Sequence, residues 1–122
     1  MKILVVDDNV DIQKMLKRKL LKQDWEVFSC ENGAQAIEMA WEVKPDLILM
    51  DMHMPVMDGY AATTEIRKWE EAQGRERTRG IALTANAMQE DEKASLDAGC
   101  DYHLTKPISK VKLLETIENS SA

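Results

Sequence analysis

The chain has 122 residues, a length that fits one domain with a single hydrophobic core. Hydrophobic residues make up 44% of it and charged residues 31%, which is the balance of an ordinary globular protein. The formal net charge of −6 argues against direct binding to nucleic acid, because phosphate binding depends on clustered lysine and arginine. No apolar run approaches the roughly 20 residues that span a bilayer, so membrane insertion is not expected.

The N-terminus and the cysteines indicate in which cellular compartment the protein is located. Met1 and Lys2 are followed by only four apolar residues before Asp7, which does not match a signal peptide. Cys30 and Cys100 are isolated and lack metal-ligand spacing, so we expect two small buried residues in a reducing compartment. A cytoplasmic location is therefore expected.

The first half of the chain alternates short apolar runs with helical patterns. The runs from Ile3 to Val6, Glu26 to Ser29 and Leu47 to Met50 are predicted strands. Between them, two helices are predicted from apolar residues at helical spacing: Ile12, Met15, Leu16 and Leu20, then Ala36, Ile37, Ala40 and Trp41. Asn9 is a candidate N-cap of the first helix, Asn32-Gly33 is a predicted turn, and Pro45 closes the second helix.

The second half continues the same alternation. Ala62, Ile66 and Trp69 predict a third helix, and the polar stretch from Gln73 to Gly80 predicts a loop. Strands are predicted from Ile81 to Leu83 and from Tyr102 to Leu104. The segment from Gln89 to Ala98 has only Leu96 as a large apolar residue, so it should be the most loosely anchored helix, and Gly99 ends it. A last helix, capped by Ser109, carries Val111, Leu114 and Ile117.

Five strand–helix units predict a fold. Strands that alternate with helices form a parallel sheet with right-handed crossovers and helices on both faces. We therefore expect one doubly wound α/β domain over residues 1–122, without repeats or an interdomain linker.

Polar residues stand just after four of the predicted strands. Asp7-Asp8, Asp51 and Thr84 follow their apolar runs directly, and Lys106 follows the short stretch from Tyr102 to Leu104. Open parallel sheets bind their ligands at the carboxyl ends of the strands, so these groups should meet in one crevice. Three carboxylates repel each other unless a cation lies between them, and Mg²⁺ suits an all-oxygen site. The combination predicts a magnesium-dependent phosphoryl-transfer site.

Taken singly, these residues have simpler explanations. Asp7 and Asp8 also fit a polar strand end beside a helix N-terminus, and Lys106 also fits an ordinary surface lysine. Pro107 restricts the backbone of Lys106, and their peptide bond is a candidate for the cis form. Thr84 stands too far before Gln89 to cap that helix, which favours a role as a hydroxyl donor.

The other chemistry-bearing residues form no second site. His53 and His103 show no ligand spacing with the cysteines, so zinc is not expected. Neither a Ser/His/Asp or Cys/His arrangement nor a glycine-rich phosphate loop is present in the sequence.

A family resemblance is carried by five motifs in a fixed order: Val5-Val6-Asp7-Asp8-Asn9, Asp51 to Gly59, Ala82 to Met88, Ala98-Gly99, and Leu104 to Ile108. With them the chain resembles, over nearly its full length, the receiver domain of two-component response regulators. The motifs around Asp51 and Thr84 are most like those of receivers in hybrid histidine kinases. The resemblance implies a flavodoxin-like sheet with strand order 2-1-3-4-5.

The resemblance also implies the function. Asp51 would be the phosphoacceptor, taking a phosphoryl group from a phosphohistidine of a histidine kinase or histidine phosphotransfer domain. Lys106 and Thr84 would contact the acyl phosphate. The protein would act as a signalling switch that catalyses only its own phosphorylation and dephosphorylation. The face between Gln89 and Ile108 would carry the signal to a downstream protein.

For the metal, the resemblance implies a specific coordination scheme. Asp8 and Asp51 would bind Mg²⁺ directly, Asp7 would act mainly through bound water, and His53 would supply its backbone carbonyl.

One position departs from the family pattern. Receivers commonly carry a phenylalanine or tyrosine switch residue three positions before the lysine, where this chain has His103. Tyr102 should not replace it, because neighbouring strand residues face opposite sides of a sheet. The chemistry of Asp51 is unaffected by this departure, whereas the usual aromatic readout is altered.

Two alternative functions compete with the switch. An aspartyl-phosphate phosphatase usually has a second aspartate two residues after its nucleophile, where this chain has His53. A phosphorylation-independent interaction module would not require the complete set of acids, threonine and lysine. Both a stand-alone regulator and a domain of a hybrid kinase fit the sequence.

Overall fold

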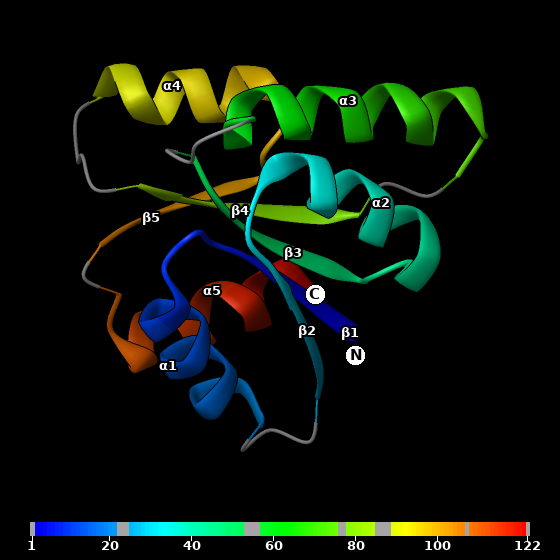
Figure 1. Cartoon of the computed structure of the whole chain (residues 1–122). Helices are drawn as coiled ribbons and strands as arrows, with labels where there is room; N and C mark the ends of the chain where they lie inside the picture. The colour runs from blue at the N-terminus through cyan, green and yellow to red at the C-terminus, as the bar shows by residue number, and fades with distance from the viewer. Residues whose placement is uncertain are drawn as a thin grey trace.

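The computed structural model describes residues 2–21, 25–52, 57–75, 78–84, 89–106 and 108–121. Five strands alternate with five helices within these residues (Figure 1). The strands are β1 Lys2–Val6, β2 Glu26–Cys30, β3 Leu47–Asp51, β4 Arg79–Thr84 and β5 Tyr102–Thr105. The helices are α1 Val10–Leu21, α2 Gly33–Val43, α3 Gly59–Ala72, α4 Gln89–Ala98 and α5 Lys110–Ser121.

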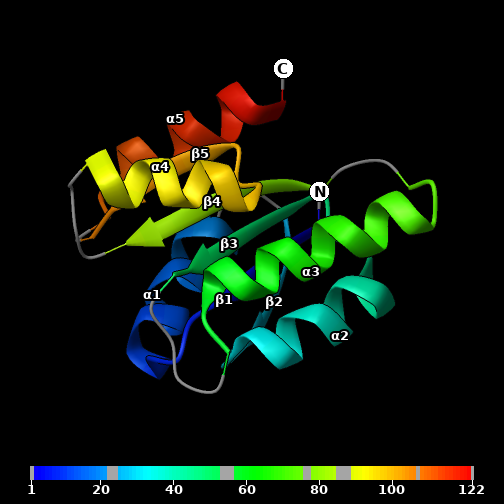
Figure 2. The same ribbon diagram turned by 90° about the horizontal axis from the view of Figure 1, so that it is seen from above.

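The strands form one parallel sheet in the order β2-β1-β3-β4-β5, which confirms the expected doubly wound fold. Strand β1 lies between β2 and β3, so Val6 pairs with Cys30 on one side and Met50 on the other. Helices α2, α3 and α4 cover one face of the sheet, and α1 and α5 cover the other (Figures 1 and 2). None of the helices in the described part of the chain has the length and apolar character that a membrane crossing requires.

The strand side chains alternate between two core layers, as the period of two in a strand requires. On β1, Leu4 and Val6 face the layer under α2 and α3, whereas Ile3 and Val5 face the layer under α1 and α5. Every residue of β3 is buried, which explains why its sequence reads as a continuous apolar run. Full burial of each large aliphatic side chain stabilises the fold by about 1.5–3 kcal/mol.

Polar side chains define the helix starts. Asn9 Oδ1 accepts from the amides of Asp11 and Ile12, so Asn9 caps α1 as predicted. Ser109 caps α5 by accepting from Lys112 N at 3.1 Å. The predicted turn at Asn32-Gly33 falls at the connection between β2 and α2, and Asn32 is also the N-cap of α2, with Oδ1 2.9 Å from Gln35 N.

Two predicted helix faces, those of α2 and α5, need correction. Trp41, expected on the buried face of α2, is 46% exposed, and its ring contacts that of Trp69 of α3 at a tilt of 34°, with centroids 5.8 Å apart. Leu113, rather than Leu114, is the fully buried leucine of α5, and Val111 is 68% exposed.

A charged network is buried under α3. Glu70 is only 4% exposed; its Oε1 pairs with Arg67 Nη1 at 2.6 Å, and its Oε2 accepts from Thr78 N at 2.7 Å. Arg67 also donates from Nε to the carbonyl of Gly99 at 3.0 Å and pairs with Asp101 at 3.4 Å. These bonds connect α3 to the start of β4 and to the segment between α4 and β5.

From residue 93 on, where its side chains are described, helix α4 buries a small residue rather than a large apolar one. Leu96 is 45% exposed, whereas Ser95 is fully buried. Gly99 ends the helix as predicted, with a φ of +116° that favours glycine. Gly99 N donates to the carbonyl of Leu96, and Cys100 N donates to that of Ser95. The exposure of Leu96 agrees with the weak apolar anchoring that the sequence predicts for this helix.

Two further predictions can be compared with the structure. Strand β4 begins at Arg79, so the loop predicted to reach Gly80 is shorter than expected. Cys30 and Cys100 are both buried and not disulfide-bonded, which confirms that they are small core residues.

Candidate functional site

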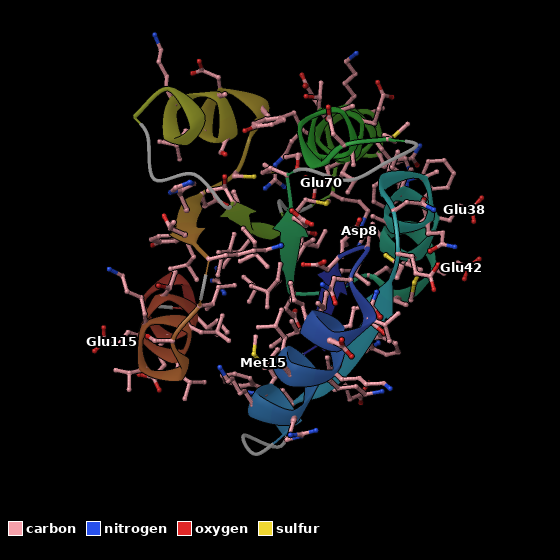
Figure 3. The ribbon with its side chains drawn as sticks, turned by 60° about the vertical axis from the view of Figure 1, so that its left-hand side comes forward. Asp8, Met15, Glu38, Glu42, Glu70 and Glu115 are labelled. Atoms are coloured by element: carbon pink, nitrogen blue, oxygen red, sulfur yellow. The ribbon has the colours of Figure 1, made fainter. Side chains whose placement is uncertain are left out.

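Four strands bring polar side chains to their carboxyl ends. Asp7 directly follows β1, Asp51 is the last residue of β3, Thr84 is the last residue of β4, and Lys106 directly follows β5. Because the strands are parallel, all of these positions lie at the same edge of the sheet. Figure 3 turns this edge toward the viewer and labels Asp8 where β1 leads into α1.

Three carboxylates meet at this edge. One oxygen from each of Asp7, Asp8 and Asp51 lies within 4.8 Å of the others. Asp7 is fully buried and Asp51 is 3% exposed, while Asp8 is exposed. Buried like charges at this distance repel strongly unless a cation compensates them. An all-oxygen set of this kind fits a hard cation such as Mg²⁺, which also keeps several water ligands.

Lys106 provides a cation from the protein itself. Its Nζ lies 3.0 Å from Asp7 Oδ2 and 3.4 Å from Asp51 Oδ2. Partial burial alone would lower the pKa of this ammonium, but the hydrogen bond to Asp7 and the charge of Asp51 outweigh it and raise the pKa. The backbone of Lys106 is held as well, because its N–H donates to the carbonyl of Thr84 at 2.7 Å. Lys106 is therefore a charged, fixed donor at this edge.

Asp7 is held at every polar atom. Its Oδ1 accepts from Asn9 N at 2.9 Å, and its Oδ2 accepts from Lys106 Nζ. Its N–H donates to the carbonyl of Cys30 at 3.2 Å, and its own carbonyl accepts from Gln13 Nε2. Of these partners, Asn9 directly precedes α1 and Gln13 lies in its first turn. The carboxylate of Asp7 is therefore fixed before any ligand arrives.

Thr84 and His103 lie on the same face of neighbouring strands. Thr84 is fully buried. His103 pairs in register with Ala82, and Ala82 faces the same side of the sheet as Thr84 because the two are two residues apart on β4. His103 Nε2 is buried and has no hydrogen-bond partner within the part of the chain that the structure describes. Tyr102 is 37% exposed and precedes His103 directly, so its side chain faces the other side of the sheet, as expected.

Two sequence predictions lie outside the described residues. They are the backbone carbonyl of His53 as a metal ligand and the cis form of the peptide bond between Lys106 and Pro107. Both remain predictions.

Gln13 is a residue of this site that sequence reasoning missed. Its Nε2 donates to the carbonyl of Asp7 and, at 2.8 Å, to that of Cys30. The signal in the sequence is its spacing: Gln13 follows Asn9 by one helical turn, and helix side chains point back toward the N-terminus.

Comparison with known proteins places this arrangement in a family. The family model described as the response regulator receiver domain matches residues 3–118. The chemotaxis protein CheY of Halobacterium salinarum is 34% identical over 118 residues, covering 96% of this chain and 93% of that protein. The sensor protein GacS of Pseudomonas syringae is 37% identical over 116 residues, covering 95% of this chain but only 13% of that protein.

Two solved structures share the fold. A receiver domain of a sensor histidine kinase from Pseudomonas aeruginosa PAO1 is 38% identical, with a TM-score of 0.86 and coverage of 97% of this chain and 94% of that one. That structure has a magnesium ion coordinated in its active site cleft. The Ssk1 receiver domain of Saccharomyces cerevisiae, in complex with the histidine phosphotransfer protein Ypd1, is 32% identical, with a TM-score of 0.91 and coverage of 96% and 86%.

Proposed function

Since this chain belongs to the response regulator receiver domain family of two-component systems, we propose that Asp51 accepts a phosphoryl group from a phosphohistidine. The observation that carries this proposal is the position of Asp51. Its carboxylate is buried at the end of β3, 3.4 Å from the Lys106 ammonium and within 4.8 Å of two further carboxylates.

The chemistry needs little from the protein beyond placement and charge. A carboxylate oxygen of Asp51 forms a bond to phosphorus while the phosphorus–nitrogen bond of the phosphohistidine breaks. The electron pair of that bond stays on the imidazole nitrogen. A transfer of this kind depends on in-line positioning and on neutralising charge on the phosphoryl oxygens. Lys106, fixed beside Asp51, supplies one positive charge for this purpose.

The proposed cofactor is Mg²⁺, held by Asp7, Asp8 and Asp51. When bound, it supplies the additional positive charge that the transferring phosphoryl group requires. We propose that Asp8 and Asp51 are direct ligands, with His53 adding its carbonyl. Asp7 then acts mainly through water, a role supported by its existing bonds to Lys106 and Asn9 N.

The proposed output begins at Thr84 and His103. The hydroxyl of Thr84 would turn toward the phosphoryl oxygens, and the side chain of His103 on the neighbouring strand would respond to that movement. The affected surface would lie between Gln89 and Ile108, which includes α4 and β5. The exposure of Leu96 supports this assignment, because a helix with few buried apolar contacts is easily shifted.

The proposed partners are a histidine kinase or a histidine phosphotransfer domain and a downstream target protein. The complex of the Ssk1 receiver domain with Ypd1 supports the first of these. We further propose that residues 1–122 form a single receiver domain in the cytoplasm, where reduced, buried cysteines are usual. The position of Lys106 between Asp7 and Asp51 supports a phosphoryl-transfer site over a phosphorylation-independent interaction module, which would not require this set of charges.

The test is phosphorylation by a small donor. Incubation with phosphoramidate and Mg²⁺ should add one phosphoryl group to the wild type, measured by intact mass. Asp51→Asn should abolish the addition. Asp97→Asn, which changes an exposed acid of α4, is the matched control and should be phosphorylated like the wild type. Equal phosphorylation of Asp51→Asn would disprove the proposal.

A further inference from the structure

Gln13 connects helix α1 to the carboxyl ends of two neighbouring strands, β1 and β2. Its Nε2 donates to the backbone carbonyls of Asp7, after β1, and Cys30, the last residue of β2. The position of Gln13 is itself fixed, because its N–H donates to the carbonyl of Asn9 at 3.1 Å in the first turn of α1. The side chain is only partly exposed.

The carbonyl of Asp7 needs this donor because the sheet ends beside it. The last ladder bond between β1 and β2 runs from Asp7 N to the carbonyl of Cys30 at 3.2 Å. In a continuing parallel ladder, residue 32 would donate to the carbonyl of Asp7. Asn32 instead caps α2, so the amide of Gln13 takes the place of the next strand residue. A buried carbonyl left without a donor is destabilising, because it has lost its hydrogen bonds to water without gaining a partner.

This bond also holds the peptide group that leads into Asp8. The carbonyl of Asp7 and the N–H of Asp8 belong to the same planar peptide group. The Asp8 carboxylate is exposed, and no described residue holds it by a hydrogen bond or ion pair. The direction in which that carboxylate enters the acidic cluster therefore depends on its backbone.

We propose that Gln13 is a positioning residue for the cation site: by holding the peptide between Asp7 and Asp8, it keeps the Asp8 carboxylate beside those of Asp7 and Asp51. This inference rests on the proposed function, because it takes the three aspartates as the magnesium ligands. Gln13 touches none of the reacting atoms and acts only through Asp8. Partners of this kind typically change metal affinity about 10–100-fold when they are removed.

The first test is Gln13→Met, which keeps the length of the side chain and removes its donor. The magnesium dissociation constant of the folded protein, measured by calorimetry, should rise about tenfold. The phosphorylation rate at saturating Mg²⁺ should stay close to the wild-type rate, because Asp51 and Lys106 are unchanged. A role in folding alone would lower the thermal midpoint and leave the dissociation constant of the folded protein unchanged.

Gln35→Met is the matched control. Gln35 lines the same open pocket of about 420 Å³ as Gln13, but its Oε1 accepts from Glu31 N at 2.8 Å and makes no bond to Asp7. Its substitution should leave magnesium affinity unchanged. A wild-type dissociation constant in Gln13→Met, or an equal rise in both variants, would overturn the proposal.

A second measurement needs no variant. In ¹⁵N NMR spectra of the wild type, the side-chain amide of Gln13 and the backbone amide of Asp8 should shift together as Mg²⁺ is added. The side-chain amide of Gln35 should not follow them. An unresponsive Gln13 amide contradicts the positioning role. The calorimetric and NMR titrations use magnesium alone, so they give an answer even if Asp51 is never phosphorylated and the proposed function fails.

Discussion

Lys106 and Asp51 form an ion pair that spans the end of β4, with Nζ and Oδ2 3.4 Å apart. The same ammonium lies 3.0 Å from Asp7 Oδ2, at the end of β1. One side chain thus connects the ends of three strands and partly compensates two buried carboxylates. A bound cation and this lysine therefore interact with the same carboxylates, so each should weaken the binding of the other to them.

The first prediction follows from this competition. Lys106→Met should leave magnesium affinity intact or raise it, because a positive charge beside the ligands is removed. In the absence of Mg²⁺ the same variant should be less stable than the wild type, since Asp7 and Asp51 lose their internal cation. Calorimetric titration and thermal unfolding with and without Mg²⁺ measure both effects. Lys112→Met, at an exposed position of α5, should change neither, and weaker magnesium binding in Lys106→Met would refute the competition.

The second prediction separates two neighbouring acids. Asp8→Ala should weaken magnesium binding by at least about tenfold and slow phosphorylation at limiting Mg²⁺. Asp7→Ala should have the smaller effect on affinity, because Asp7 is already engaged by Asn9 N and Lys106. The magnesium dissociation constants of the two variants show which aspartate contributes more to binding. The coordination scheme fails if Asp8→Ala binds magnesium as tightly as the wild type.

The third prediction concerns stability at the opposite end of the sheet. Arg67→Met should destabilise the protein by about 3 kcal/mol, because it leaves the buried charge of Glu70 without its cation. Lys68→Met provides a control on the same helix, since its ion pair with Glu65 is exposed and should contribute less than about 1 kcal/mol. Urea unfolding measures both values. Equal effects of the two substitutions would show that the network under α3 does not stabilise the fold.

The fourth prediction concerns alkaline pH. Burial raises the pKa of the Cys30 thiol from 9.0 to about 12, although a backbone hydrogen bond at Asn32 partly opposes this shift. The unfolded chain therefore releases this proton first, so stability is complete below pH 9.0 and falls as the pH rises toward 12. Lys106, whose pKa is raised above 10.5, adds a further loss beyond that pH.

Two measurements check the role of Cys30. The stability of Cys30→Ala should fall less steeply than that of the wild type between pH 9 and 11, because the variant lacks this titrating group. Iodoacetamide at pH 8 should leave Cys30 unmodified in the folded protein and modify it in urea. Rapid alkylation of folded protein would contradict the raised pKa.

Much of the fold could be predicted because buried elements leave periodic patterns. Runs such as Leu47 to Met50 read as strands since both faces of the sheet are covered. The errors occur where neighbouring residues fit the same pattern equally well. Leu113 and Leu114 differ by one position, and only the packing of α5 decides which of them is buried. The sequence carries no information that separates these choices.

The site could be predicted in part for a different reason. Asp7 and Asp51 directly follow apolar runs and Lys106 stands just after a short one, so parallel topology alone brings them together. Gln13 and Glu70 were missed because their importance depends on long-range hydrogen bonds, to Asp7 and to Thr78. A polar residue of this kind reads as solvent-facing until the fold places its partner beside it.

The last prediction concerns the output side of the domain. His103 lies on the same face of the sheet as Thr84, and its Nε2 is buried without a partner within the described part of the chain. Burying a polar ring gains less free energy than burying a large aromatic one. An inward movement of residue 103 that follows phosphorylation should therefore be favoured less in this chain than in a variant with tyrosine there. Amide exchange across residues 89–108, with and without BeF₃⁻ as a phosphoryl mimic, measures that movement.

His103→Tyr should show a larger change in exchange than the wild type, because its ring gains more apolar burial and its hydroxyl can still reach a polar partner. Tyr102→His is the matched control, since residue 102 faces the other side of the sheet and should leave the response unchanged. Equal responses of the wild type and His103→Tyr would show that residue 103 does not limit the switch. Changes confined to α1 would show that the signal leaves through another surface.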